Sequence, residues 1–401
     1  INCNISYICK FENSIRFLSI MNDFSSYIGI IGGGISGLTL GCTLKKYRIN
    51  TIIFEKEPHL HDEGAGISIS PNGLLALERL ELKNELEKNS YKSSKALLKY
   101  NNSPLLEMDS PVYTMNRRNL INILYKKYID LGGEMLFEYE LQDLDIEKKE
   151  CLFTNSSLRK IRHVIASDGI KSLVREKFFS DGSQPIYSGY SAWRGTIESD
   201  NPNLEISFSS NKHLVSYPIN SDLKRSFTGI IKTNEQINES WREKGNLETF
   251  IKQFEETNYK ISEIFESAEN IYKWGIFIRP PLKSIIKKNI TLIGDAAHPM
   301  VPFLGQGACI AIEDAYTFGY LCYELKCEFE KVQRMYQLLR LKRNNKIQKM
   351  SLNQGKLNHL KNPILVFLRN QLMKKTDIVS NRLKTIHNYD VHEETIKSLS
   401  N

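Results

Sequence analysis

The most informative stretch for predicting the fold of this chain is YIGIIGGGISGLTLGCTLKKY, from Tyr27 to Tyr47. It predicts an apolar strand over 27–31, a turn of glycines, and an apolar helix that follows directly. A second apolar run, TIIFE, ends at Glu55. Strand, helix and strand in this order are typical of a βαβ unit with two parallel strands, so we expect an α/β fold.

Three glycines in the turn form the pattern Gly32-x-Gly34-x-x-Gly37. Gly32 permits a tight turn, Gly34 lets the backbone approach a pyrophosphate, and Gly37 lets the helix pack closely on the strands. The N–H groups of the helix start face the phosphates. Glu55, 18 residues beyond Gly37, stands where a carboxylate accepts hydrogen bonds from ribose hydroxyls. Together these residues predict an adenine dinucleotide site.

A second informative stretch, LIGDAAHPMVPFLGQGACIAIEDA, covers 292–315. Its apolar start predicts a strand that places Gly294 and Asp295 at its carboxyl end, where ligands bind in parallel sheets. Asp295 can accept a hydrogen bond from a ribitol hydroxyl, and we interpret His298 as structural. A helix start then leaves backbone N–H groups free for the pyrimidine edge of a flavin. The residues expected there are Pro302, Gly305, Gln306 and Gly307.

Composition narrows the class of protein. The 401 residues are 41% hydrophobic and 25% charged, as in an ordinary globular chain with a large core. The net charge of +8 suits anionic ligands, but the basic residues are scattered, and we expect no nucleic acid binding. Seven cysteines without CxxC spacing predict no disulfide framework and no metal site, and they fit the cytoplasm. The apolar window 27–44 contains the glycine turn, so no integral membrane segment is expected.

The strand and helix patterns divide the chain into discontinuous domains. A helical stretch is expected over 71–89, short strands over 135–167, and a mainly antiparallel sheet over 179–276 with a helical insert. The predicted Rossmann-like FAD-binding domain comprises 22–90, 111–178 and 277–345. The inserted β-sheet substrate domain comprises 91–110 and 179–276. Residues 1–21 are expected to be a disordered extension, and 346–401 a C-terminal helical segment.

Together with SDGIKSLVR at 167–175, these motifs resemble the class A FAD-dependent monooxygenases, the single-component aromatic hydroxylases. The resemblance covers about 27–314 and is greatest to the branch of salicylate hydroxylase, urate hydroxylase and zeaxanthin epoxidase. It implies that Asp168 binds both FAD and nicotinamide and that Gly66 lies in a loop passing the flavin ring. The string MNRRNL matches the HRxxL helix start of the family and implies an FAD contact for Arg117. The histidine of that motif is Asn116 here, so its role does not carry over.

The substrate side carries weaker signals, and no catalytic residue is assigned. The strings YSGYSAWRG and HLVSYP resemble strands near the flavin. A guanidinium suits bidentate recognition of a carboxylate, so Arg194 is a candidate to bind an acidic substituent. The candidates to line the pocket are Tyr190, Trp193, Arg194 and Tyr217.

The expected activity follows from the resemblance. FAD would be reduced by NADH or NADPH, which binds transiently because no second glycine motif exists. Dioxygen would then form a flavin hydroperoxide that hydroxylates a small aromatic or heteroaromatic substrate. We expect a monomer or homodimer. Two alternative functions on the same scaffold remain open: a flavin reductase or dehydrogenase, and an epoxidase. A halogenase is disfavoured because GWxWxIP is missing, and the flavin-specific loop at 294–295 disfavours a dinucleotide sensor.

Overall fold

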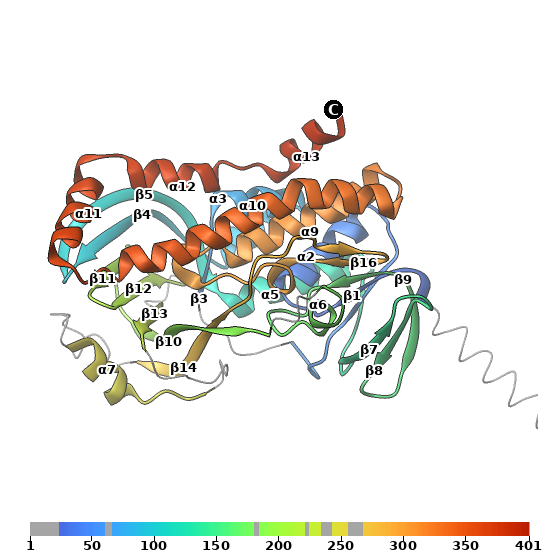
Figure 1. Ribbon diagram of the computed structural model, residues 1–401, viewed down its shortest axis with the longest axis horizontal. Helices are drawn as coiled ribbons and strands as arrows, with labels where there is room; N and C mark the ends of the chain where they lie inside the picture. Colours follow the sequence, from blue (N-terminus) through green and yellow to red (C-terminus); the bar gives the residue numbers. More distant parts are fainter. Residues whose placement is uncertain are drawn as a thin grey trace, which may run out of the picture.

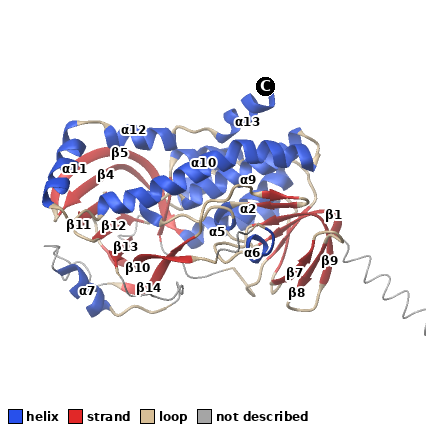
Figure 2. Ribbon diagram, viewed as in Figure 1, coloured by secondary structure: helices blue, strands red, loops and turns tan. Residues whose placement is uncertain are grey.

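The structure is a computed structural model that describes residues 24–60, 66–179, 184–220, 224–233, 243–255 and 268–400. The extension predicted at 1–21, and Gly64 and Ala65 of the loop before Gly66, lie outside these residues. The described residues form two large sheets that are flanked by helices (Figures 1 and 2).

The first sheet contains the predicted βαβ unit. Its order is β15-β16-β9-β1-β2-β6, with β1 parallel to β2, β9 parallel to β1, and the hairpin β7–β8 attached to β9. Helix α2 (Ile35–Lys46) follows the glycine turn, as the sequence predicts. The strands are β1 (Phe24–Ile31), β2 (Thr51–Phe54), β6 (Glu134–Leu136), β7 (Leu141–Asp145), β8 (Glu150–Phe153), β9 (Leu158–Ala166), β15 (Ile286–Lys287) and β16 (Ile290–Leu292).

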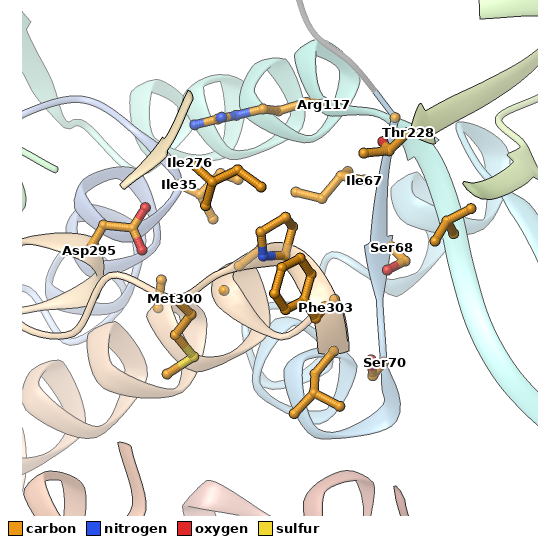
Figure 3. Close-up of a pocket in the computed structure, with 18 of the residues that line it drawn as sticks. Ile35, Ile67, Ser68, Ser70, Arg117, Thr228, Ile276, Asp295, Met300 and Phe303 are labelled. Carbon is orange, nitrogen blue, oxygen red and sulfur yellow. The ribbon is translucent and has the colours of Figure 1, made fainter. Parts of the chain in front are cut away.

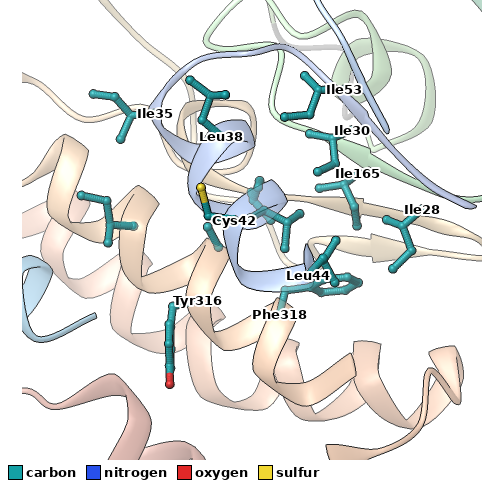
Figure 4. Packing of buried hydrophobic residues seen from close by; sticks show 14 of the residues in the cluster. Ile28, Ile30, Ile35, Leu38, Cys42, Leu44, Ile53, Ile165, Tyr316 and Phe318 are labelled. Carbon is teal, nitrogen blue, oxygen red and sulfur yellow. The ribbon is translucent and has the colours of Figure 1, made fainter. Parts of the chain in front are cut away.

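Helices bury the central strands of this sheet. Leu38 and Cys42 of α2 are fully buried, as are Ile30 and Ile53 on β1 and β2. Helix α9 (Gly307–Glu324) packs on α2 and contributes Phe318 to the same cluster (Figure 4). Burial explains why these strands are continuous apolar runs rather than alternating ones.

The second sheet has the order β14-β10-β13-β12-β11-β4-β5-β3, and all its pairs are antiparallel except β11 with β4. Its strands come from 66–116 and 186–278, between the strands of the first sheet, so it is an insertion in that sheet's sequence. The strands are β3 (Gly66–Ile69), β4 (Tyr91–Tyr100), β5 (Ser103–Asn116), β10 (Ile186–Glu198), β11 (Leu204–Ser209), β12 (Lys212–Pro218), β13 (Lys224–Lys232) and β14 (Glu269–Ile278).

Further helices connect and cover the sheets. The helical stretch expected over 71–89 is divided in two, because Glu81 adopts φ 63°, which ends the first helix. Helix α10 crosses both sheets in Figure 1 and runs through residue 346 without a break. These helices are α3 (Pro71–Arg79), α4 (Lys83–Lys88), α5 (Arg117–Asp130), α6 (Leu173–Phe178), α7 (Leu247–Glu255), α10 (Phe329–Asn358), α11 (Pro363–Lys375), α12 (Ile378–His387) and α13 (Val391–Ser400).

Two short 3₁₀ turns lie on the chain between the sheets and α9. They are η1 (Gly294–Ala296) and η2 (Pro302–Leu304). No helix among the described residues has both the length and the apolar character needed to cross a bilayer.

Candidate FAD and substrate site

One cavity of about 1130 Å³ is lined by both sheets. One end lies at the glycine turn after β1 and at the carboxyl end of β9. The other end lies between the second sheet and helices α11 and α12. This position matches the rule that α/β sheets bind ligands beyond the carboxyl ends of their strands.

The glycine turn has the geometry that a phosphate site requires. Gly32 has φ +100°, and a Cβ there would lie 2.6 Å from the Ser167 carbonyl oxygen. A Cβ on Gly37 would lie 2.0 Å from the Gly32 carbonyl oxygen. A Cβ on Gly34 would meet nothing within 4 Å, because this backbone borders the cavity. The start of α2 has no side-chain cap, so its N–H groups are available to an anion in that space.

Glu55 is held at the edge of the cavity by two backbone donors. Its Oε2 accepts from the Gly33 N–H at 2.6 Å, and its Oε1 accepts from the Glu57 N–H at 3.0 Å. Each carboxylate oxygen keeps a further lone pair. The orientation suits the predicted role of accepting hydrogen bonds from ribose.

The turn after β9 brings Asp168 to the same cavity. Burial raises the pKa of Asp168, and its Oδ1 has no hydrogen-bond partner within the described part of the chain. Arg175 in the following helix donates to the carbonyls of Ala297 and Pro280 at 2.8 and 2.7 Å. These bonds attach this turn to the loop that carries Asp295.

Arg117 and Asp295 extend into the middle of the cavity from different elements (Figure 3). Arg117 is the first residue of α5, and Asn116 caps that helix by accepting from the Arg118 N–H at 2.9 Å. The asparagine at the position of the family's histidine therefore caps the helix. Desolvation by the protein that encloses the cavity lowers the pKa of Arg117 and raises the pKa of Asp295; each charge partly opposes the effect on the other.

The start of α9 also opens on the cavity. Gly305 adopts φ 62°, and a Cβ on Gly307 would meet nothing within 4 Å. Gln306 is turned away, since its Nε2 donates to the Ser70 Oγ at 2.9 Å. No side chain caps α9, so its first N–H groups can stabilise negative charge on a bound group.

His298 lies outside the cavity lining and pairs with Asp314 of α9. Asp314 also accepts from Arg340 Nε at 2.7 Å, from Asn344 Nδ2 at 2.8 Å and from the Gly294 N–H at 3.1 Å. Burial alone would raise the pKa of Asp314, but His298 and Arg340 outweigh it and hold the pKa below its ordinary value. This buried network fixes the backbone beside Asp295, and no local sequence pattern indicated it.

Of the predicted substrate residues, the structure brings Arg194 and Tyr217 to the cavity. The Arg194 guanidinium lies 4.9 Å from the centre of the Trp274 ring, and its Nε has no hydrogen-bond partner in the part of the chain described. Trp193 points to the other face of β10, where it packs on Phe250. Tyr190 packs against Phe303, and among the described residues neither Tyr190 nor Trp193 lines the cavity, although Phe303 does.

The sequence reasoning missed a buried histidine pair at the sheet end of the cavity. His213 on β12 lines the cavity, and its Nδ1 lies 2.6 Å from the Nε2 of His359, the residue after α10. Burial lowers the pKa of both, that of His359 to about 3, so the pair is neutral near pH 7. The two residues are 146 positions apart, and no local pattern joins them.

These residues fit FAD and define a class of protein, the flavoproteins of the Rossmann type. Gly32, Gly34 and Glu55 suit the ADP half, while Arg117, Asp295 and the α9 start suit the ribityl chain and flavin. The comparisons agree: residues 26–327 match the family described as "FAD binding domain", and the chain belongs to that family.

Relatives give the class of enzyme. The 3-amino-4-hydroxybenzoate 2-monooxygenase PtmB3 of Streptomyces platensis is 28% identical, over 83% of this chain and 88% of its own length. The 3-hydroxybenzoate 6-hydroxylase of Polaromonas naphthalenivorans (strain CJ2) is 24% identical over 86% and 91%. A salicylate hydroxylase substrate complex shares the fold, with a TM-score of 0.79 and 21% identity over 94% and 98%. The chain is an FAD-dependent enzyme of the monooxygenase class.

Proposed function

We propose that this enzyme hydroxylates a small aromatic or heteroaromatic substrate that carries an acidic group, with NADH or NADPH and dioxygen as co-substrates. The observation that carries the proposal is the continuity of this cavity. It joins the glycine turn to a compartment where Arg194, Trp274 and Tyr217 meet. The relatives named for hydroxybenzoate hydroxylation support an aromatic acid.

The chain contributes binding, orientation and exclusion of water. When bound, FAD supplies the redox chemistry, accepting a hydride from the nicotinamide and activating dioxygen. Arg117 and Asp295 would hold its ribityl chain, and the N–H groups of Gly307 and Ala308 would stabilise negative charge on the pyrimidine ring. The apolar side chains of Ile67, Ile276 and Phe303 line the part of the cavity near Arg117 and the start of α9 (Figure 3), and they would exclude water from it.

Substrate recognition would rest on Arg194 and His213. Arg194 offers an anionic substituent a guanidinium whose Nε has no hydrogen-bond partner among the described residues, while Trp274 offers a ring face beside it. His213 is neutral and its Nδ1 is held by His359, so its other ring nitrogen is able to form a hydrogen bond with a phenol hydroxyl. Both side chains border the cavity, as a substrate contact requires.

The test is NADH and NADPH oxidation by the FAD-loaded protein, with and without a panel of phenols and hydroxybenzoates. We expect an aromatic acid to accelerate the oxidation and to gain one oxygen atom from isotopically labelled dioxygen, as shown by product mass. Nicotinamide oxidation that no aromatic compound accelerates, with no labelled product, would contradict hydroxylation and favour a flavin reductase. A labelled epoxide from an alkene would favour the epoxidase alternative.

A further inference from the structure

Helix α11 has its apolar side turned outward. Ile364, Leu365, Phe367 and Leu368 are 50–69% exposed, whereas Arg369 is only 9% exposed. Arg369 donates to the Leu357 carbonyl at 2.8 Å and lies over the rings of Tyr100 and Phe208. A surface helix normally buries its apolar residues and exposes its charged ones, so α11 is inverted.

The exposed apolar residues form one face. Ile364, Leu365, Phe367, Leu368 and Leu372 recur at the spacing of neighbouring positions on a helix. The inward side contains Val366, Arg369 and Met373. Of the thirteen large exposed hydrophobic residues in the described part of the chain, six lie between 364 and 378. A contiguous apolar patch of this kind marks an interaction site.

This face continues into the mouth of the cavity. Leu372 and Ile378 are 47% and 48% exposed, and both also line the cavity. Behind them the cavity wall combines the apolar side chains of Leu98, Met108 and Phe208 with two arginines, Arg369 and Arg382. Figure 1 places α11 at the outer end of the molecule beside β4 and β5. A ligand that enters between α11 and α12 therefore crosses the exposed apolar face first.

The charges around this face are mostly basic. Residues 361–384 hold six basic side chains, of which Arg369 is buried, and one acidic side chain, Asp377. Lys361 lies just before α11, and Lys374 and Lys375 end it, all exposed. This pattern complements anionic headgroups, and it would repel a second copy of the same face. Contact between two copies here would also close the cavity mouth.

We propose that the outer face of α11 docks on an anionic lipid bilayer. Ile364, Phe367 and Leu368 would enter the headgroup boundary, and Lys361, Lys374 and Lys375 would contact acidic lipids. Thirteen residues are too short to span a bilayer, so the helix lies in the interface plane. The docked mouth would admit an aromatic acid whose ring is embedded in the bilayer interface; this second point rests on the proposed function.

The experiment is co-sedimentation of the FAD-loaded full chain with vesicles. One set contains phosphatidylcholine alone, and the other contains equal parts of phosphatidylcholine and phosphatidylserine. We expect binding to the anionic vesicles, weakened by added salt and much weaker without phosphatidylserine. Leu368→Glu, 55% exposed on α11, should lower the affinity on the order of tenfold. The matched control Leu338→Glu, 71% exposed on α10, should leave the affinity unchanged.

Equal binding by both variants, or no binding by the wild-type chain, would overturn the proposal. If the outer face of α11 instead binds a second copy of this chain, the wild-type protein will be a dimer in the absence of vesicles, and Leu368→Glu will convert it to a monomer. If this face instead binds a different protein, the wild-type chain will not co-sediment with either set of vesicles. FAD content and nicotinamide oxidation in solution are read separately, so a failure of hydroxylation is distinguishable from a failure of membrane docking.

Discussion

Asp295 and His298 are three positions apart, yet their surroundings differ. Asp295 is open to the cavity, whereas His298 is 3% exposed and paired with Asp314. Arg194 and Trp193 are adjacent and lie on opposite faces of β10. At this scale, the direction of a side chain decides whether it meets a ligand or the core.

We predict that Asp295→Ala weakens FAD binding more than His298→Ala does. The carboxylate should accept hydrogen bonds from the ribityl chain, and leaving those hydroxyls unpaired should cost about 1–3 kcal/mol of FAD binding free energy. His298→Ala should instead lower the free energy of unfolding, because Asp314 loses a partner. FAD titration of the two apoproteins is the measurement. Equal FAD affinities would show that Asp295 does not contact the cofactor.

We predict that Arg194→Met weakens the binding of an anionic substrate by about 2–4 kcal/mol while FAD content stays normal. Methionine keeps much of the aliphatic stem over Trp274, so the packing is largely retained. Substrate titration, followed by the flavin spectrum, measures the effect. A neutral analogue of the same ring is the control, and its affinity should not change. Unchanged affinity for the acid would move recognition to Tyr217 and His213.

Helix starts are the elements that build the cofactor end of the site. Helices α2 and α9 both begin at the cavity without a side-chain cap, and each has a glycine where a Cβ would meet nothing within 4 Å. The N-termini of α2 and α9 place the positive ends of two helix dipoles at the same cavity, which suits the phosphates and the flavin of FAD. Close packing of α2 on its own turn depends on a different glycine, Gly37.

We predict that Gly34→Ala and Gly37→Ala affect different properties of the protein, the first its FAD affinity and the second the stability of the apoprotein. The methyl group on Gly34 enters the cavity, so FAD affinity should fall by about 1–3 kcal/mol while the apoprotein stays stable. The methyl group on Gly37 meets the Gly32 carbonyl at 2.0 Å, so the apoprotein itself should be destabilised. Urea unfolding of each apoprotein and FAD titration are the two measurements. A Gly34→Ala protein with normal FAD affinity would contradict the phosphate role of this turn.

At the scale of the whole molecule, buried charges between α9 and α10 connect distant parts of the chain. Arg340 is fully buried and bonds both Asp314 at 2.7 Å and Glu313 at 2.7 Å, and Glu313 also accepts from Arg343. Asn72 of α3 donates to Glu313 at 2.7 Å, so the network reaches the element after β3. The cofactor loop, the sheet insertion and the C-terminal helices are thereby connected through one polar cluster.

We predict that Asp314→Asn destabilises the protein by about 3–5 kcal/mol, since Arg340 and His298 lose their buried carboxylate. The matched control is Glu330→Gln, which removes the exposed pair with Arg334 and should leave the stability unchanged within error. The pKa of Asp314 is depressed, so its contribution is complete above its unfolded pKa of about 4 and is lost as the pH falls. Urea unfolding between neutral and acidic pH should therefore show a smaller acid loss in Asp314→Asn.

Local sequence patterns were sufficient to predict the βαβ unit and the Rossmann-type FAD fold. They were sufficient because Gly32, Gly37, Gly294 and Asp295 lie in short motifs beside apolar strands, where local spacing dictates the turn. The inserted sheet was predictable for the same reason, since alternating strand patterns are local. The individual roles of Glu55 and the other cofactor residues stay predictions.

The side chains that face one another across the cavity could not be predicted, because long-range packing brings them together. Alternation places Trp193 and Arg194 on opposite faces, but the packing of α7 decides that Trp193 enters the core and Arg194 the cavity. The pair of His213 with His359 is likewise a long-range contact. The outward direction of the apolar face of α11 also depends on how this helix packs against distant parts of the chain. A one-dimensional pattern specifies period and direction along an element, whereas the face that is buried depends on what the rest of the chain packs against it.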